Sequence, residues 1–534
     1  MLGAPPLPPG TRSSWRNSLR RWLLAAVISL SGLVLVTGAA RAQTTRPNIL
    51  LIIADDVGVE SIEAYRETFN GIDGHPHTPT LNALAAQGVR FRHAWANPLC
   101  GAARATMQTG RYGHRTGILG SGGTLSAAEL SLPEALATQG YASALIGKWG
   151  LSDAGEARQV VQSGYDHFAG TPSAVLQPFS YFGWRRHVAT FAPARAACRA
   201  SRHPVTHENA DCIEASSAVL PEQDPASYAT TRNVSDATDW IRQHRGQPWF
   251  LVLSFNAPHT PVHAPPDALH DVDAKALLPA GSCSPGLCYR AMVEAMDEKI
   301  GELLAWLRNA QELDRTVVIF VSDNGPEEFV AADPERSKYT LFEGGVNVPL
   351  IVKGPGVVAG KSGEGRVSDA LINTTDLYMT VLELAGVAPC EIPGDHDSYS
   401  FVPILAGVTG EIRHYAYAEV LSSRAGKAIR NRAGLKLQRS IDGQAPAWFL
   451  FDLAKDPEEK HNLFDEEGQA PSALQAEVAR LKVLLGDENV SKAAVPPPRL
   501  PAANLDPDAD GVVGPIVEGR ACRSDLRAYD LGPP

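Results

Sequence analysis

The sequence predicts an α/β fold: a large, mostly parallel sheet flanked by helices, with a smaller C-terminal α+β subdomain that contains an antiparallel sheet. Almost wholly apolar runs recur along the chain and each leads into polar residues, as strands buried on both faces of a parallel sheet do. Helix-like stretches alternate with these runs, which favours helices on both faces of the sheet. After about residue 410 the pattern changes to short strands and one helix.

Four apolar runs are the expected strands of the parallel sheet. They are residues 48–54, 142–146, 249–255 and 317–321, and they lead in turn into Asp55-Asp56, Gly147-Lys148-Trp149, Asn256-Ala257-Pro258-His259 and Ser322-Asp323-Asn324-Gly325. One strand that ends in Asp would mean little, because Asp is common in turns and helix caps. Four strands that deliver complementary polar groups indicate a ligand site, since ligands bind beyond the carboxyl ends of the strands in such sheets.

The helices expected around this sheet span residues 78–87, 130–139 and 289–309. The first has Thr78 as its cap and Pro79 at a favoured first helical position. In the C-terminal subdomain we expect strands at 415–419 and 448–453 and a helix at 472–485. Leu474, Val478, Leu481 and Leu485 recur at spacings of three and four residues, which predicts a packing face for that helix.

The N-terminal 42 residues have the features of a secretory signal peptide. Five arginines and no acid accompany an apolar run at 23–40, which is followed by Arg41-Ala42. An uncleaved membrane anchor is the alternative. Cleavage after Ala42 would leave 492 residues with a net charge of −16, in place of 534 residues and −11. We therefore expect a periplasmic or secreted protein with no stable membrane association after cleavage.

Composition narrows the class of protein. The chain has 44% hydrophobic and 20% charged residues without charge blocks, which excludes a disordered or collagenous chain. Its excess of acids over Lys and Arg argues against a nucleic-acid partner. The expected organisation is a signal peptide at 1–42, a catalytic domain at 43–409, a C-terminal subdomain at 410–494 and a Pro-rich tail at 495–534.

The chain has seven cysteines, an odd number for an exported protein. Cys100 differs from the others in its surroundings, the stretch Asn97-Pro98-Leu99-Cys100-Gly101-Ala102-Ala103-Arg104. The remaining six could form three disulfides in an oxidising compartment. Proximity in sequence suggests the pairs Cys198–Cys212 and Cys283–Cys288, with Cys390–Cys522 left over, although six cysteines allow 15 pairings.

The polar groups at the strand ends fall into two sets. Asp55, Asp56, Asp323 and Asn324 offer only oxygen donors, which suit Ca²⁺ or Mg²⁺ and not Zn²⁺. Arg104, Lys148, His259 and Lys338 can be cationic. A metal ion and several cations around one nucleophile bind and polarise a tetrahedral oxyanion, so a sulfate or phosphate ester is the expected substrate.

Several motifs resemble those of type I sulfatases of the alkaline phosphatase superfamily, over roughly residues 46 to 465. Cys100-Gly101-Ala102-Ala103-Arg104 with Thr109-Gly110-Arg111 is similar to the sulfatase signature C-x-(P/A)-x-R…TGR. The strand-end motifs above match as well, as do Pro258-His259-Thr260-Pro261, Lys338-Tyr339-Thr340-Leu341-Phe342-Glu343-Gly344-Gly345 and Leu450-Phe451-Asp452-Leu453 with Asp456-Pro457 and Asn462-Leu463. Together, and in this order, these motifs are specific.

The resemblance implies hydrolysis of an organic sulfate ester to an alcohol or phenol and inorganic sulfate. In the family a formylglycine-generating enzyme oxidises the signature cysteine, here Cys100, to an aldehyde whose hydrate attacks sulfur, and a second hydroxyl then allows sulfate to leave. By resemblance Asp55, Asp56, Asp323 and Asn324 hold Ca²⁺ (or Mg²⁺), which contacts the hydrate at Cys100. The resemblance likewise implies that Arg104 stabilises the hydrate, that Lys148 and Lys338 bind sulfate oxygens, and that His259 protonates or orients the leaving oxygen.

Two positions depart from the family pattern. Gly150 stands where G-K-W-H sequences have a histidine that helps to deprotonate the hydrate, which leaves Lys148, His93, His114 or another side chain that reaches the site as candidates for the base. Ala102 stands where proline is commonest; the oxygen-dependent maturing enzyme prefers proline, whereas the radical-based one accepts alanine. His263 is a second choice to His259 as the imidazole of the site.

Residues 170–235 form an insertion with aromatic residues at Phe179, Tyr181, Phe182 and Trp184. It could line a pocket for a sugar or aryl group or form a surface loop closed by a disulfide. A small-molecule or glycan sulfate ester is the expected substrate, and the acidic net charge favours small or sparsely sulfated ones. The alternatives are a phosphonate monoester or phosphodiester hydrolase on the same scaffold, and a catalytically silent binder of sulfated polymers.

Overall fold

A computed structural model describes Gly3 and residues 46–68, 75–191, 212–272, 284–358, 360, 364–387, 396–421, 424–442 and 445–486. The chain divides into two units, Met1–Arg46 and Pro47–Pro534, and every helix and strand reported below belongs to the second. This second unit contains two β-sheets, one of ten strands and one of four.

The ten-stranded sheet has the order β10-β2-β9-β8-β1-β7-β3-β4-β5-β6. Its strands are β1 (Asn48–Ala54), β2 (Val89–Trp95), β3 (Ala142–Lys148), β4 (His167–Thr171), β5 (Arg185–Phe191), β6 (Ile213–Val219), β7 (Trp249–Ser254), β8 (Thr316–Ser322), β9 (Leu350–Lys353) and β10 (Arg366–Asn373). The central strands β8, β1, β7, β3 and β4 are mutually parallel, whereas β9 and β5 each pair antiparallel with both neighbours.

Helices cover both faces of the sheet, as the alternating pattern predicts. On one face lie α3 (Cys100–Thr109), α5 (Leu132–Ala137), α6 (Ala157–Gln162) and α10 (Leu377–Leu384); on the other lie α2 (Pro79–Ala85), α7 (Ala229–Gln243) and α8 (Pro285–Asn309). The short helices are α4 (Gly113–Thr116), α9 (Glu343–Val346) and α11 (Val402–Leu405).

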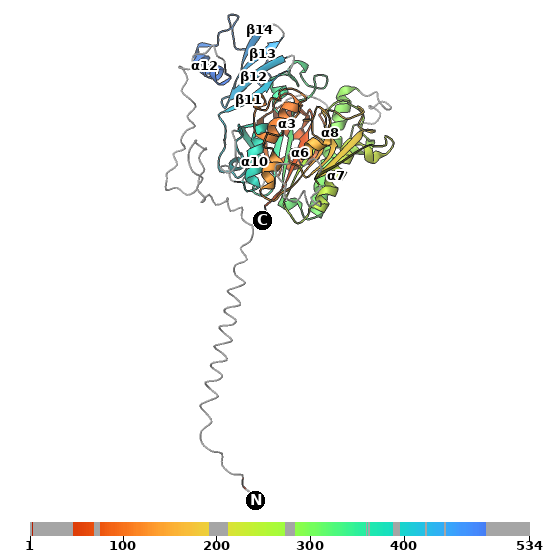
Figure 1. Ribbon diagram of the computed structural model, residues 1–534. Helices are drawn as coiled ribbons and strands as arrows, with labels where there is room; N and C mark the ends of the chain where they lie inside the picture. The colour runs from red at the N-terminus through yellow and green to blue at the C-terminus, as the bar shows by residue number, and fades with distance from the viewer. Residues whose placement is uncertain are drawn as a thin grey trace. The chain divides into compact units, whose positions relative to one another are not determined.

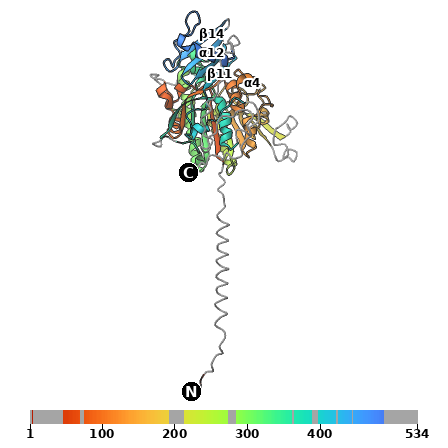
Figure 2. The same cartoon turned by 90° about the vertical axis from the view of Figure 1, so that its left-hand side faces the viewer.

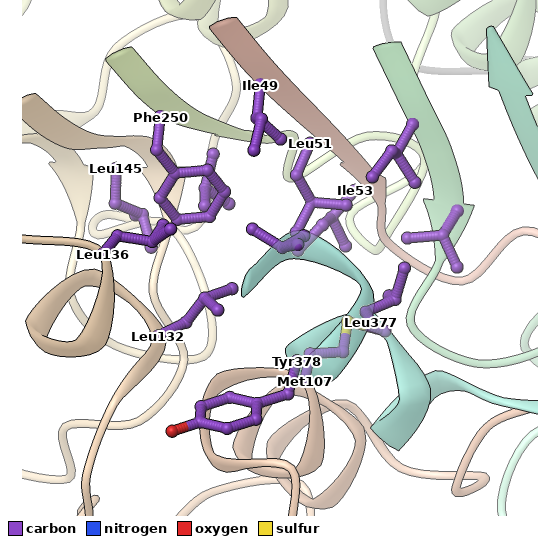
Figure 3. Packing of buried hydrophobic residues seen from close by; sticks show 14 of the residues in the cluster. Ile49, Leu51, Ile53, Met107, Leu132, Leu136, Leu145, Phe250, Leu377 and Tyr378 are labelled. Atoms are coloured by element: carbon purple, nitrogen blue, oxygen red, sulfur yellow. The ribbon is translucent and has the colours of Figure 1, made fainter. Parts of the chain in front are cut away.

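Strand β1 shows why its sequence is apolar throughout. Ile49, Leu51 and Ile53 face the core that contains Met107 of α3 and Leu377 of α10 (Figure 3), and the residues between them face the core beneath α7 and α8. All seven residues of β1 are buried. At about 1.5–3 kcal/mol for each large apolar side chain removed from water, this strand anchors both layers.

The smaller sheet is an antiparallel meander of β11 (Tyr415–Val420), β12 (Arg424–Asn431), β13 (Leu435–Asp442) and β14 (Ala445–Asp452). Figure 1 shows these strands side by side in blue, with α12 (Gln475–Leu484) next to them. Val478, Leu481 and Leu485 pack onto Leu437 and Leu450 of the sheet, which confirms the packing face predicted for this helix. Figure 2 shows β11 next to α4 of the larger part.

The expected central elements are present, with shifted ends. The expected strand at 142–146 continues to Lys148, and the expected helix at 289–309 begins one turn earlier, at Pro285. The helix expected at 130–139 is shorter, because it starts after the Ser131 capping box and ends at Ala137. The helix expected at 472–485 begins with a 3-10 turn, Ser472–Leu474.

Several predictions fall on residues outside the described ranges. They are the signal peptide at 1–42, the Pro-rich tail at 495–534, and the pairing partners Cys198, Cys283, Cys390 and Cys522. Among the three described cysteines Cys100 is free, and Cys212 and Cys288 are disulfide-bonded, so the proposed connectivity stays a prediction. Within the described part of the chain, no helix has the length and apolar character needed to cross a membrane.

Candidate active site

Cys100 is the first residue of α3, and its side chain is buried. The thiol donates a hydrogen bond to the carbonyl oxygen of Ser121 at 3.2 Å. Its position at the start of a ten-residue helix places it where unpaired backbone N–H groups favour negative charge. Burial raises the pKa of the Cys100 thiol, which therefore stays protonated and is a weak nucleophile as it stands.

The carboxyl ends of β1 and β8 bring the predicted oxygen donors together. The two strands are parallel and in register up to Ala54 and Ser322, so that Asp55 and Asp56 emerge beside Asp323 and Asn324. The amide N–H of Asp56 donates to Asp323 Oδ1 at 3.1 Å, and Asn324 Nδ2 donates to Asp56 Oδ1 at 2.7 Å. All four residues are at most 1% exposed.

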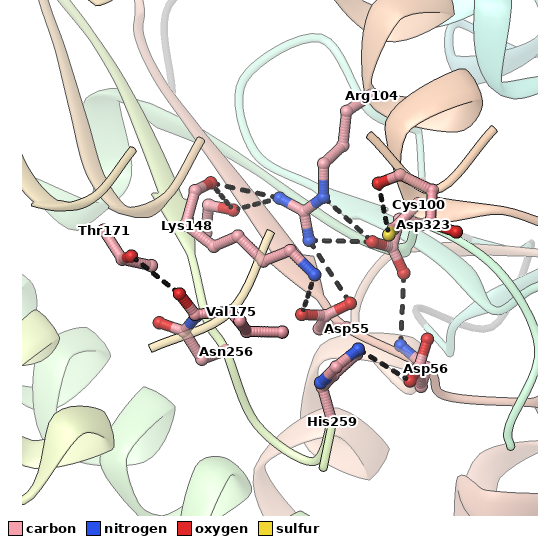
Figure 4. Close-up of polar contacts among 12 residues, drawn as sticks. Asp55, Asp56, Cys100, Arg104, Lys148, Thr171, Val175, Asn256, His259 and Asp323 are labelled. Atoms are coloured by element: carbon pink, nitrogen blue, oxygen red, sulfur yellow. Dashed lines mark hydrogen bonds and ion pairs between the residues drawn. The ribbon is translucent and has the colours of Figure 1, made fainter. Parts of the chain in front are cut away.

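Arg104 lies one helical turn after Cys100 and joins three strand ends (Figure 4). Its Nε donates to Asp323 Oδ2 at 2.9 Å, and its Nη2 lies 2.7 Å from the same oxygen and 3.7 Å from Asp55 Oδ1. Its Nη1 donates to the Lys148 carbonyl at 3.1 Å and to Ser254 Oγ at 2.5 Å. The orientation of the guanidinium is thus fixed by groups at the ends of β3, β7 and β8.

Lys148, the last residue of β3, is fully buried. Its Nζ donates to Asp55 Oδ2 at 2.5 Å. Gly147, which precedes Lys148, allows β3 to lie close to β7. Its φ is +104°, and a Cβ there would lie 1.8 Å from the carbonyl oxygen of Ser254.

Lys338 comes from the loop before α9 and contacts Asp56, whereas Lys148 contacts Asp55. Its Nζ lies 2.8 Å from Asp56 Oδ1 and 2.9 Å from Glu327 Oε1. The lysine is only 2% exposed. Its buried ammonium is therefore shared between one predicted metal ligand and one carboxylate that the sequence motifs did not indicate.

Of the two candidate imidazoles, His259 faces the carboxylates. Its Nε2 lies 3.8 Å from Asp56 Oδ2, and its Nδ1 lies 2.9 Å from the carbonyl oxygen of Thr260. Both ring nitrogens of His263 are engaged elsewhere, Nδ1 with the carbonyl of Pro261 and Nε2 with the hydroxyl of Tyr228. The geometry favours His259, as the motif did.

The pKa values of the cluster show how burial and charge compete. Burial raises the pKa of Asp55 well above its ordinary value, although Lys148 and Arg104 lie beside it. Burial also opposes ionisation of Asp56, but Lys338 and His259 outweigh it and lower the pKa of Asp56 to about 2. Burial lowers the pKa of His259 to about 4, against the attraction of Asp56.

The residues present fit a hard divalent cation. Oδ1 of Asp55 and Oδ1 of Asn324 are buried and accept no hydrogen bond, so two oxygen atoms of the cluster are available to a cation. One ligand atom from each of Asp55, Cys100 and Asp323 lies within 4.8 Å of the others, and the same holds for Asp55, Asp56 and His259. Carboxylate and amide oxygens are the donors that Ca²⁺ and Mg²⁺ prefer.

Gly150 sits against Arg104 and does not leave an empty place for a histidine side chain. Its φ is +75°, and a Cβ added there would lie 3.2 Å from Cδ of Arg104. Among the candidates for the base, Lys148 pairs with Asp55 within the cluster. His93 instead contacts Arg430, with Nδ1 3.3 Å from Nη1, and His114 pairs with Glu419 at 2.9 Å.

Most of the aromatic side chains described in the insertion pack into a hydrophobic cluster. Tyr181 and Trp184 are at most 2% exposed and pack with Tyr228, and Trp184 Nε1 donates to the carbonyl of Ser227. Phe182 is partly buried against the same cluster, whereas Phe179 is 54% exposed. These described residues form a packed cluster, and residues 192–211, with Cys198 of the proposed loop closure, lie outside the described ranges.

Sequence motifs missed three residues that contact the site. Ser254 Oγ accepts from Arg104 and donates to the Lys148 carbonyl at 2.7 Å; its position at the end of β7, two residues before Asn256, was a usable signal. Glu327 is reached through the Asp323-Asn324-Gly-Pro-Glu turn. Tyr181 belongs to the aromatic residues of the insertion, but its contact with the loop of His259 joins segments 78 residues apart and is not visible in the sequence.

Comparison with known proteins gives one family. Residues 47–387 match the family model described as Sulfatase, and residues 336–483 match the one described as N-sulphoglucosamine sulphohydrolase, C-terminal. Arylsulfatase A of Bos taurus is 30% identical over 85% of this chain and 90% of its own length. N-acetylgalactosamine-6-sulfatase of Sus scrofa is 30% identical over 69% of this chain and 67% of its own.

Solved structures agree with this result. The PsFucS1 sulfatase from Pseudoalteromonas sp. is similar with a TM-score of 0.60 and 25% identity, over 84% of this chain and 93% of that one. The large mostly parallel sheet with a smaller antiparallel sheet is thus the alkaline-phosphatase-like fold of these proteins. The chain belongs to the sulfatase family and is a sulfuric ester hydrolase.

Proposed function

We propose that the protein hydrolyses an organic sulfate ester to an alcohol or phenol and inorganic sulfate, with a formylglycine hydrate made from Cys100 as nucleophile and Ca²⁺ as its metal ion. The observation that carries the proposal is the convergence of Asp55, Asp323, Arg104 and Lys148 on Cys100 at the carboxyl ends of parallel strands. The aldehyde hydrate supplies one hydroxyl for attack on sulfur and a second for release of sulfate.

The charges of the cluster support a bound cation. Asp55, Asp56, Asp323 and Glu327 surround three cations, Arg104, Lys148 and Lys338. Fully ionised, these seven groups carry one net negative charge, which repels an anionic ester. A divalent cation reverses that sign, so that a singly charged sulfate ester becomes attracted to the site.

Asp55, Asp56, Asp323 and Asn324 would hold the cation, together with the group derived from Cys100. When bound, the cation polarises the oxygens of the sulfate group as a Lewis acid. Mg²⁺ is the alternative to Ca²⁺, since both prefer oxygen donors.

The cationic side chains have separate tasks in this proposal. Arg104 lies one turn from Cys100 and is fixed by Asp323 and Ser254, so it can stabilise negative charge on the hydrate without moving. Lys148 pairs with Asp55 and Lys338 with Asp56, and both lysines would bind sulfate oxygens. Glu327, 2.9 Å from Lys338 Nζ, would keep that lysine in position.

His259 is the proposed partner of the leaving oxygen. The Thr260 carbonyl lies 2.9 Å from Nδ1 and favours a proton there, which leaves Nε2 to face the cluster. Burial keeps the imidazole neutral in the free protein, with a pKa of about 4. A bound sulfate ester adds negative charge beside Nε2 and favours its protonated form, which can then protonate the leaving oxygen.

The relatives indicate two substrate types. By their names, one acts on aryl sulfates and another on the 6-sulfate of N-acetylgalactosamine. A small-molecule or glycan sulfate is the substrate that we propose for this chain. We also propose that a formylglycine-generating enzyme acts on Cys100, and that the chain is exported through residues 1–42 and is disulfide-bonded. Its catalytic domain spans 43–409, with a C-terminal subdomain at 410–494.

The rates of hydrolysis of 4-nitrophenyl sulfate and of a matched phosphodiester, each measured as the only substrate, test the proposal. The sulfate should be the faster substrate, Cys100→Ala should abolish turnover without lowering Tm, and a chelator should stop turnover until Ca²⁺ is restored. Faster hydrolysis of the phosphodiester, or turnover by Cys100→Ala, would contradict it.

A further inference from the structure

We infer that Tyr181 is a positioning residue for His259, which its hydroxyl holds at the leaving-group side of the site. The inference rests on the proposed function and adds to it a residue outside the catalytic motifs. Tyr181 lies in the aromatic insertion between β4 and β5, far in sequence from the loop that follows β7.

The contact is direct and involves the backbone of the catalytic loop. The hydroxyl of Tyr181 lies 2.5 Å from the carbonyl oxygen of Asn256 and 2.8 Å from that of His259, and it can donate its proton to either. The N–H of His259 donates to the same Asn256 carbonyl at 3.0 Å. One hydroxyl therefore ties together the two ends of the turn that carries the imidazole.

The other side of this turn is held by β1. Phe255 N–H donates to the carbonyl of Ile53 at 2.9 Å, and Asp55 N–H donates to that of Ala257 at 3.2 Å. The turn is thus fixed between the strand end that carries the metal ligands and the hydroxyl of Tyr181. Removing that hydroxyl frees the side on which His259 sits and leaves the attachment to Asp55 intact.

Tyr181 is itself held in place. It is 2% exposed, its carbonyl accepts from the N–H of Ala229 at the start of α7 at 2.9 Å, and its ring lies 4.4 Å from the ring of His263. Burial raises the pKa of Tyr181 well above its ordinary value, so the hydroxyl keeps the proton that it donates. A rigid donor of this kind fixes an orientation, because its own position does not vary.

The test compares the leaving-group dependence of Tyr181→Phe with that of wild type, over aryl sulfates whose phenols range from acidic to weakly acidic. Phe keeps the ring packing and removes only the hydroxyl. For poor leaving groups kcat should fall by about 10- to 100-fold, because they need the proton from a correctly placed His259. For 4-nitrophenyl sulfate, whose leaving group needs little protonation, the change should stay below about threefold.

Tyr65→Phe is the matched control. Tyr65 is 1% exposed, and its hydroxyl binds the backbone of Leu350 in β9, not the turn that carries His259: it donates to the carbonyl at 2.9 Å and accepts from the N–H at 2.8 Å. The Tyr65→Phe variant should lose a similar amount of Tm to Tyr181→Phe, but its change in kcat relative to wild type should be the same for all leaving groups. In a His259→Ala background, Tyr181→Phe should add no further selective loss, because the two changes act through one group.

Three results would overturn the inference. They are an equal loss for all leaving groups, an unchanged profile in Tyr181→Phe, and a selective loss that persists without His259. Absence of sulfate release by wild type would overturn the proposed function and the inference together. An active wild type with a uniform Tyr181→Phe defect would overturn the inference alone.

Discussion

At the residue scale, the structure brings the side chains proposed for the active site together, and Gly150 is the position that departs from the family pattern. Its left-handed backbone and its closeness to Arg104 explain a glycine there in terms of this chain alone. A Cβ at this position would make a tight contact of 3.2 Å with Cδ of Arg104. In the proposed mechanism another group would be the base, and Lys148 is a candidate because it already belongs to the cluster.

Gly150→Ala should lower kcat by about 10-fold or more, because the new methyl group displaces Arg104. Gly140→Ala is the control: its φ of +77° is nearly the same, but nothing lies within 4 Å of the added Cβ. Both variants should lose about 1–2 kcal/mol of stability from the backbone conformation. Equal activity of the two variants in a sulfate-release assay would show that Arg104 tolerates the methyl group.

The residues that the sequence could predict share one property: they follow apolar strands or lie within a motif. Asp55, Lys148 and Asp323 are of this kind. Tyr181 does not share this property, because it lies between β4 and β5 and reaches the turn of His259 only in the folded chain. No local pattern encodes such a contact.

At the element scale, the central strands can be predicted from the sequence, whereas the outer strands cannot. Strands β1, β7 and β8 are apolar throughout because both of their faces are covered, which makes them visible in the sequence. Strand β6 exposes six of its seven residues, and β12, Arg424–Asn431, mixes charged with small side chains. Neither forms an apolar run, so neither could be predicted in that way.

The C-terminal sheet is joined to the loop of Lys338 through a buried ionic network. Lys436 of β13 is fully buried and lies 3.3 Å from Glu343 Oε1 and 2.7 Å from Glu459 Oε1. Glu459 Oε2 accepts from the N–H of Glu343, the first residue of α9, at 2.5 Å. Helix α9 follows Lys338 by five residues, so the network supports the loop that carries that lysine.

Lys436→Met should therefore destabilise the protein by about 3–5 kcal/mol, because it leaves the buried carboxylate of Glu459 without its cation and the half-buried one of Glu343 with Arg430 alone. Lys455→Met is the control, since Lys455 is 84% exposed and its pair with Asp452 should contribute at most about 1 kcal/mol. Denaturant unfolding measures both. Similar losses in the two variants would mean that the network contributes no more than a surface ion pair.

At the scale of the whole molecule, the chain carries a net charge of −11. The charged cluster around Asp55 and Asp56 is also negative by one when fully ionised, and a bound divalent cation would make it positive. Small or sparsely sulfated substrates should therefore be hydrolysed better than dense polyanions, which the acidic surface repels over about a Debye length. Higher kcat/KM on a heparin-like chain than on a monosulfated sugar at low salt would contradict this.

Buried neutral histidines should make global stability depend on pH. Burial beside Arg186 lowers the pKa of His167 from 6.5 to about 4, with Asp236 opposing it, and Nδ1 of His167 lies 2.8 Å from Thr190 Oγ1. The unfolded chain takes up this proton at a higher pH than the folded chain does. The free energy of unfolding should thus fall as pH falls from 6.5 to about 4, by at most about 3 kcal/mol for this group.

His167→Asn should flatten that slope in denaturant titrations at pH 7 and pH 4.5. His461→Asn, which changes a side chain that is 82% exposed, should leave the slope as in wild type. An unchanged slope in His167→Asn would assign the acid sensitivity to other groups.

The central claim is that Cys100 becomes the nucleophile by conversion to formylglycine. Mass spectrometry of the peptide that spans Leu99 to Arg111, from protein made in its native host, tests it most directly. The account predicts an aldehyde, or its hydrate, in place of the thiol at Cys100. An unmodified thiol in all of the protein would contradict the account.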